Sequence, residues 1–184
     1  MITLRKTVPK DLETILEVEL LAFKGDRSIK TLVTELLVDP SAEPIISLLA
    51  YDDEKPVGHI LFSKAKIKSG WGFCSLKPGS YILAPLAVIP EAQKQGIGGM
   101  LIKEGLCALR KIGAERCFVL GHKEYYPRFG FIPNAIKAGF PAPYPIPEKN
   151  HDAWMWQDLT DDPCDEKGQI ICANALMRKK YWRE

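Results

Sequence analysis

Three closely spaced glycines, Gly96, Gly98 and Gly99, stand between a polar loop and a stretch with helical apolar spacing. Glycine lets backbone amides approach a ligand without obstruction from a Cβ atom. The first turn of a helix leaves about four amides unpaired and carries partial positive charge. Together these features predict an anion site, most naturally for a phosphate or a pyrophosphate. In the alternative interpretation the glycines only ease packing of the helix against a sheet.

Two common phosphate-binding motifs do not fit this segment. The dinucleotide-binding fingerprint G-x-G-x-x-G needs a glycine where Leu101 stands, and no acidic residue ends the next predicted strand. The P-loop needs the run Gly-Lys-Ser/Thr, which the chain lacks. Both nucleotide-binding interpretations therefore fail on residues that their chemistry requires.

A second group of reactive side chains follows the predicted strand over 116–120. The spacing from Tyr126 to Phe131 reads Tyr-x-x-x-Gly-Phe, and Tyr125, one residue earlier, would face elsewhere on a helix. A tyrosine hydroxyl within hydrogen-bond reach of a leaving group can protonate it as charge develops. In the alternative interpretation both tyrosines pack as amphipathic aromatic residues.

The elements that must position these residues follow from apolar periodicity. Strands are predicted at 2–5, 45–51, 57–67, 81–88, 116–120 and 154–159. Helices are predicted at 10–23, 28–37 and 97–111, and 70–79 is predicted to be a loop. This order is typical of a mixed α/β sandwich in which strands 81–88 and 116–120 run parallel.

The chain changes character after residue 133. Alternating prolines over 139–147 exclude a helix or a central strand there. Trp154 and Trp156 share one face of their strand, and core packing is the favoured interpretation of both. The final segment, 170–182, fits either one strand or one helix.

The run Gln93-Lys94-Gln95-Gly96-Ile97-Gly98 fits the pattern Q/R-x-x-G-x-G/A and follows a strand that ends at Val88. In this context it resembles the acetyl-CoA site of the GNAT N-acetyltransferase superfamily, within a bacterial group of predicted acetyltransferases. The resemblance implies an α/β fold with a mostly antiparallel central sheet and flanking helices, in which the parallel strands 81–88 and 116–120 splay apart. Pro85 agrees with such a gap, because proline inside a strand usually marks a bulge or an edge.

The same resemblance implies roles for individual residues. Backbone amides of residues 94–99 would hold the pyrophosphate of CoA, the strand 86–88 would pair with the pantetheine arm, and Tyr126 would protonate the departing CoA thiolate. The implied cofactor-binding residues are Leu86, Ala87, Val88, Gln93, Lys94, Gln95, Gly96, Ile97, Gly98 and Gly99. Acetyl-CoA is the expected acyl donor, and no metal is expected.

The general base is left open. The acceptor must lose a proton because an ammonium cannot attack a thioester, yet the strand 81–88 contains no acidic residue. The remaining candidates are His59, Glu124, His151 and Asp152. Many family members have an asparagine early in the tyrosine segment; here His122 stands nearby, and whether it contacts the cofactor is equally open.

The expected function is acetyl transfer from acetyl-CoA to a primary amine by direct attack. One domain over 1–184 is expected, with a core over 2–131 and an extension over 132–184 that completes the sheet and the acceptor site. Candidates for lining an acceptor groove are 10–38, 70–79 with Trp71 and Phe73, and 139–147. The alternative function is a non-catalytic acyl-CoA-binding or regulatory module, which would keep the glycine turn without acid–base machinery.

Composition narrows the class of protein. With 25 Lys+Arg against 23 Asp+Glu the net charge is +2, which argues against nucleic acid as a partner. No apolar run approaches about 18 residues, so no membrane association is expected. Five cysteines without a CxxC pair favour reduced thiols and a cytoplasmic location. The acceptor amine is then the expected partner, and a homodimer is the default among oligomers.

Overall fold

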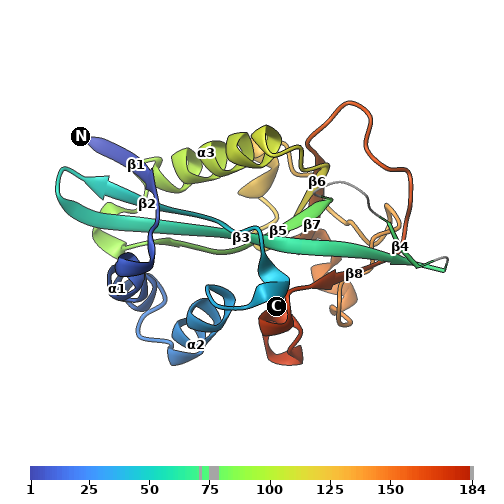
Figure 1. Cartoon of the computed structure of the whole chain (residues 1–184), viewed down its shortest axis with the longest axis horizontal. Helices are drawn as coiled ribbons and strands as arrows, with labels where there is room; N and C mark the ends of the chain where they lie inside the picture. Colours follow the sequence, from blue (N-terminus) through green and yellow to red (C-terminus); the bar gives the residue numbers. More distant parts are fainter. Residues whose placement is uncertain (71, 75–78, 183–184) are drawn as a thin grey trace.

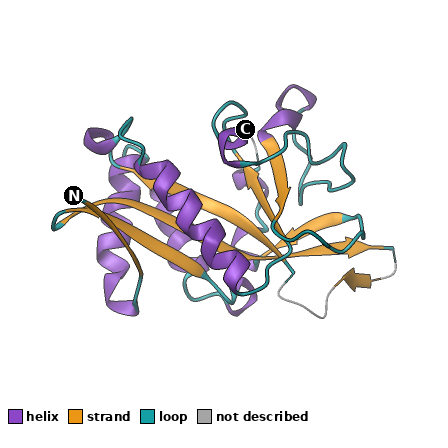
Figure 2. Cartoon of the chain, turned by 90° about the horizontal axis from the view of Figure 1, so that it is seen from above, coloured by secondary structure: helices purple, strands orange, loops and turns teal. Residues whose placement is uncertain are grey.

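The computed structural model describes residues 1–70, 72–74 and 79–182. A central sheet lies between two helical layers: α3 (Ile97–Lys111) covers one face, whereas α1 (Leu12–Ala22) and α2 (Arg27–Leu36) cover the other (Figure 1). Seen from above, α3 lies along the strands of the sheet (Figure 2). The helices predicted over 10–23, 28–37 and 97–111 are therefore confirmed, with shifts of one or two residues at their ends.

The sheet is built mainly from antiparallel neighbours. Its order is β1-β2-β3-β5-β6-β7, with β4 and β8 each paired to β3. The bounds are β1 Ile2–Lys6, β2 Ile46–Asp52, β3 Lys55–Ser69, β4 Gly72–Cys74, β5 Ser80–Val88, β6 Arg116–Leu120, β7 Trp154–Asp158 and β8 Gln169–Cys172. Within the described ranges only β5 and β6 run parallel. This confirms the predicted sheet, including its one parallel pair.

The parallel pair separates part of the way along. Pairing between β5 and β6 ends at Leu83 opposite Val119, and β6 itself ends at Leu120. Strand β5 continues to Val88 and keeps its pairing with β3 on the other side. The β3–β5 register shifts beside Pro85, which confirms the bulge that this proline predicts. One edge of β5 is thus left without a strand partner among the described residues beyond Leu83.

Two segments differ from their predicted structure. The predicted loop 70–79 contains β4, which pairs with β3, while Trp71 and residues 75–78 lie outside the described residues. The segment 170–182 is neither one strand nor one helix, since β8 is followed by two short 3₁₀ turns. Strand β8 ends at Cys172 because β2 occupies the next positions on the same edge of β3.

The expectation that the cysteines are reduced is wrong for Cys164, which lies in the segment after residue 133. Cys164 is disulfide-bonded, whereas Cys107, Cys117 and Cys172 are free thiols. Trp154 is fully buried and stacks on Phe118 at 5.3 Å between ring centroids, which confirms its predicted place in the core.

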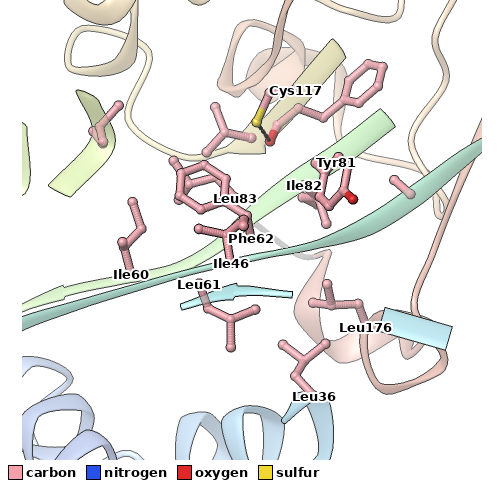
Figure 3. Packing of buried hydrophobic residues seen from close by; sticks show 14 of the residues in the cluster. Leu36, Ile46, Ile60, Leu61, Phe62, Tyr81, Ile82, Leu83, Cys117 and Leu176 are labelled. Atoms are coloured by element: carbon pink, nitrogen blue, oxygen red, sulfur yellow. Dashed lines mark hydrogen bonds between the residues drawn. The ribbon is translucent and has the colours of Figure 1, made fainter. Parts of the chain in front are cut away.

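The core fills both faces of the sheet. Leu61 packs on the side of α2, where Leu36 lies, and Phe62 lies on the opposite face under α3 (Figure 3). The fit under α3 is tight at Gly105, where a Cβ atom would lie 2.1 Å from Cε2 of the fully buried Phe62. Only glycine at this helix position leaves room for the ring.

Gly105→Ala is expected to destabilise the protein by about 2–3 kcal/mol, because overpacking a filled core forces the ring or the helix to move. Urea denaturation followed by circular dichroism measures the change. Glu104→Ala, at the exposed neighbouring position, is the matched control and should stay within about 0.5 kcal/mol of the wild type. Equal stability of the two variants would contradict the packing described for α3.

An acid-sensitive contact ties β1 to the start of α1. The Arg5 guanidinium donates to both carboxylate oxygens of buried Asp11 at 2.7 and 2.8 Å, and the Val8 amide donates at 2.7 Å. These donors, Arg5 first, lower the pKa of Asp11 to about 2. Because the pKa is depressed in the folded state, the contact stabilises the fold above the ordinary carboxyl pKa and is lost as the pH falls toward 2.

Wild-type protein is therefore expected to lose about 1–2 kcal/mol of stability between about pH 4 and pH 2 through this contact, allowing for solvent around Arg5. Asp11→Asn should be less stable at neutral pH and should lack this step. Denaturant midpoints at a series of pH values measure both. An identical acid dependence in the two proteins would show that Asp11 titrates normally.

Candidate functional site

A cleft of about 980 Å³ lies on the α3 side of β5, between the glycine turn and the tyrosine segment. Nine of the eleven predicted site residues line it: Leu86, Val88, Gln93, Lys94, Gly96, Ile97, Gly98, Gly99 and Tyr126. Ala87 is buried and belongs to the opposite face of β5, since side chains alternate along a strand. Gln95 is exposed and donates through Nε2 to the Glu91 carbonyl at 3.2 Å.

The loop between β5 and α3 is held by its own hydrogen bonds. The Gln93 side chain donates to the Val88 carbonyl at 3.0 Å and so fixes the loop against the end of β5. Lys94 and Gly96 both adopt left-handed backbone conformations, with φ of 63° and 83°. Gly96 is the N-cap of α3, a position where glycine takes this conformation without a Cβ penalty.

The amides of this turn have no acceptor in the part of the chain that the structure describes. Among the described residues, no group accepts a hydrogen bond from the backbone N–H of residues 94–99, and no side chain caps the helix. Met100 is the first amide with a partner, the Gly96 carbonyl at 3.0 Å. Unpaired amides at a helix N-terminus create positive potential, and the Lys94 and Lys103 side chains add charge to the lining. The arrangement suits an anion with several oxygens.

Tyr126 lies in the same cleft, at the start of a 3₁₀ turn over Tyr126–Phe129. It is largely buried and packs edge to face on Phe131, with ring centroids 5.8 Å apart. A Cβ at Gly121 would lie 2.6 Å from the Tyr126 ring, so a glycine is needed at the end of β6 for the ring to take this position. Its role in proton transfer stays a prediction.

Tyr125 also lines the cleft, contrary to the expectation that it faces elsewhere. That expectation assumed a regular helix, whereas residues before the 3₁₀ turn follow an irregular path. The Tyr125 hydroxyl reaches the glycine turn, where a Cβ on Gly98 would lie 2.6 Å from it. Arg128 lies over the ring at 4.7 Å, and burial raises the pKa of the Tyr125 hydroxyl. The four-residue spacing of Tyr125 and Phe129, whose rings pack together, is the sequence signal that could have placed Tyr125 at the cleft.

The candidates for a general base lie outside this cleft. His59 is fully buried, with both ring nitrogens bonded to other side chains. Glu124 and Asp152 are exposed, and the His151 ring bonds to the Ile146 carbonyl at 3.1 Å. His122 does line the cleft, but no aspartate or glutamate is present in its described lining. None of the four predicted base candidates therefore lies in the described lining beside Tyr126.

Neither a metal-binding group nor a membrane-spanning helix is found over the described ranges. No group of three or more histidine, cysteine, aspartate or glutamate side chains within them is arranged to hold a metal ion. Nor does this part of the chain contain a helix long and apolar enough to cross a membrane.

Comparisons with known proteins agree with this geometry. Residues 44–133 match the family model described as "Acetyltransferase (GNAT) domain". The chain is 49% identical over 172 residues to the protein named uncharacterized N-acetyltransferase YjhQ of Escherichia coli K12, covering 94% of this chain and 92% of that relative.

Two solved structures resemble the fold over nearly its whole length. The GNAT family N-acetyltransferase YhbS of E. coli, in complex with CoA, superposes with a TM-score of 0.81 at 26% identity, covering 96% of this chain and 92% of that one. A GNAT family acetyltransferase of Brucella melitensis, in complex with acetyl-CoA, gives a TM-score of 0.73 at 30% identity, covering 96% and 98%. The chain therefore belongs to the GNAT family of N-acetyltransferases.

Proposed function

We propose that the cleft binds acetyl-CoA and that the protein transfers the acetyl group to a primary amine. The observation that carries the proposal is the set of backbone amides of residues 94–99, which have no acceptor among the described residues and belong to a turn that borders the cleft. A diphosphate offers oxygens that can accept several such hydrogen bonds at once, and the helix N-terminus favours its charge. The similarity to proteins solved with CoA and acetyl-CoA supports the same ligand.

The free edge of β5 supplies the second half of the binding site. Beyond Leu83 this edge has no strand partner among the described residues, while Leu86 and Val88 line the cleft beside it. An amide-containing arm such as pantetheine can pair with an open strand edge as an added strand does. The proposal therefore assigns pyrophosphate binding to residues 94–99 and pantetheine binding to residues 86–88.

The proposed chemistry is direct attack. Acetyl-CoA would supply the acetyl group as a thioester, whose carbonyl carbon the unprotonated amine attacks. Tyr126 holds a proton at Oη, and this hydroxyl gives it to the sulfur as the carbon–sulfur bond breaks. The acceptor amine loses its own proton to water or to a basic group of the acceptor molecule, since the described cleft lining contains no carboxylate.

A second function, acyl-CoA binding without catalysis, is favoured by that missing carboxylate. Release of free thiol from acetyl-CoA, screened against polyamines, aminoglycosides, amino acids, peptides and lysine side chains, separates the two. The proposal expects thiol release that depends on one class of amine and a rise in melting temperature with CoA. A rise in melting temperature with no thiol release for any amine would favour the binding module. If CoA does not raise the melting temperature and no amine releases thiol, both functions are overturned.

A further inference from the structure

We propose that Ser47 is an activated nucleophile of a second site, which takes the acyl group of small apolar esters. The Ser47 Oγ atom lies 2.9 Å from Nε2 of His59, and Nδ1 of the same ring lies 2.5 Å from Oε1 of Glu19. The three side chains come from β2, β3 and α1 and meet on the α1 side of the sheet. This is the order of groups in a serine–histidine–carboxylate triad, which is recognised by geometry and roles.

The contacts assign each group a part. His59 and Glu19 are fully buried, so their hydrogen bond is not exposed to competition from water. In the proposed triad the Glu19 carboxylate accepts a hydrogen bond from Nδ1–H of His59, which leaves Nε2 to accept the hydroxyl proton of Ser47. Burial raises the pKa of Glu19 and the bond to His59 opposes this shift, so the carboxylate is favoured most when the ring gains a second proton. That is the moment at which Ser47 attacks.

Ser47 opens onto a pocket of its own. A pocket of about 450 Å³ is lined by Ser47 together with the apolar residues Val8, Leu12, Ile15, Leu37 and Ile45. The described lining also contains one cation, Lys6, and one carboxylate, Glu43, and the Lys6 ammonium can offset charge on a carbonyl oxygen. No residue of this lining belongs to the larger cleft, so the second site is separate from the proposed acetyl-CoA site. Its mainly apolar walls favour an ester with an apolar acyl chain.

The reaction balances without a further reactant except water. The Ser47 oxygen forms a bond to the ester carbonyl carbon as its proton moves to Nε2 of His59. The carbon–oxygen bond to the alcohol then breaks, and the leaving alkoxide takes that proton from His59. Water, deprotonated by His59 in turn, hydrolyses the acyl-serine and releases the carboxylic acid with the ring restored.

A fluorophosphonate probe tests the nucleophile directly, because it phosphonylates activated serines. Native wild-type protein is expected to be labelled at Ser47, located by tandem mass spectrometry, and labelling should disappear when the protein is heat-unfolded. His59→Gln should label at least about 100-fold more slowly, as loss of a general base implies. Ser63→Ala is the matched control and should label like the wild type, because it removes a buried hydroxyl on the neighbouring strand β3 that has no hydrogen-bond partner among the described residues.

Hydrolysis of p-nitrophenyl butyrate gives an independent readout. Ser47→Ala should remove it while CoA-induced thermal stabilisation is kept, so failure of this site is distinguishable from failure of the proposed acetyl transfer. No label at Ser47 in folded wild-type protein would overturn the proposal, whatever the variants do. Equal labelling of Ser47 before and after heat-unfolding, or label at Ser41 instead, would overturn it as well.

Discussion

Tyr126→Phe is expected to lower kcat for acetyl transfer by about 100-fold, within the range that a general acid contributes. The substitution removes only the hydroxyl, and the ring keeps its contacts with Tyr125 and Phe131. The hydroxyl acts on the sulfur only as the carbon–sulfur bond breaks, so the dissociation constant for CoA should change less than about twofold. Steady-state kinetics and isothermal titration calorimetry measure the two quantities.

Tyr125→Phe is the matched control, because it removes a hydroxyl from the neighbouring ring of the same cleft. The kcat of this variant should stay within about threefold of the wild type if only Tyr126 serves as the acid. An unchanged kcat in Tyr126→Phe would remove the assigned role. A large loss in Tyr125→Phe alone would transfer the role to Tyr125.

Gly98→Val is expected to weaken CoA binding by at least about 30-fold, the equivalent of one or two lost hydrogen bonds to a charged group. A Cβ added to Gly98 would lie 2.6 Å from the Tyr125 hydroxyl oxygen and 3.7 Å from a Val88 methyl carbon. A branched side chain would therefore displace Tyr125 or cover the amides that the diphosphate must reach. Calorimetric titration with CoA measures the loss.

Two further variants show how the loss of CoA affinity in Gly98→Val arises. Glu104→Val places the same side chain at an exposed position of α3 and should leave CoA affinity unchanged. Adding Tyr125→Phe to Gly98→Val removes the oxygen that the new side chain meets. If affinity returns in the double variant, the clash with the Tyr125 hydroxyl caused the loss, whereas affinity that stays low indicates that the new side chain covers the amides themselves. Wild-type affinity in Gly98→Val would contradict binding of the diphosphate at this turn.

Local patterns were enough to predict most of the fold. The apolar run of β5 and the helical spacing of α3 are properties of consecutive residues, and both elements lie within one residue of their predicted bounds. Strand β8 could not be predicted in this way. Residues 169–172 form a strand because β3 extends beyond the start of β2 and leaves part of its edge open, a fact that the tail sequence does not contain.

In the site, too, the features formed by neighbouring residues were predictable and those formed by residues distant in sequence were not. The glycine turn was predictable because its chemistry lies in the backbone of neighbouring residues. The environment of His59 was not, since its partners Glu19 and Ser47 are 40 and 12 residues away in sequence. A histidine that appeared as a candidate base is thereby placed in a different network, away from Tyr126.

The central claim is that the amides of residues 94–99 bind the diphosphate of CoA. The most direct test is a titration of ¹⁵N-labelled protein followed by amide resonances, with CoA in one series and pantetheine, which lacks the diphosphate, in the other. CoA should shift the amides of Lys94 to Gly99 most strongly, whereas pantetheine should shift residues of β5 and leave those amides unchanged. Binding of CoA without movement of the 94–99 resonances would contradict the assignment.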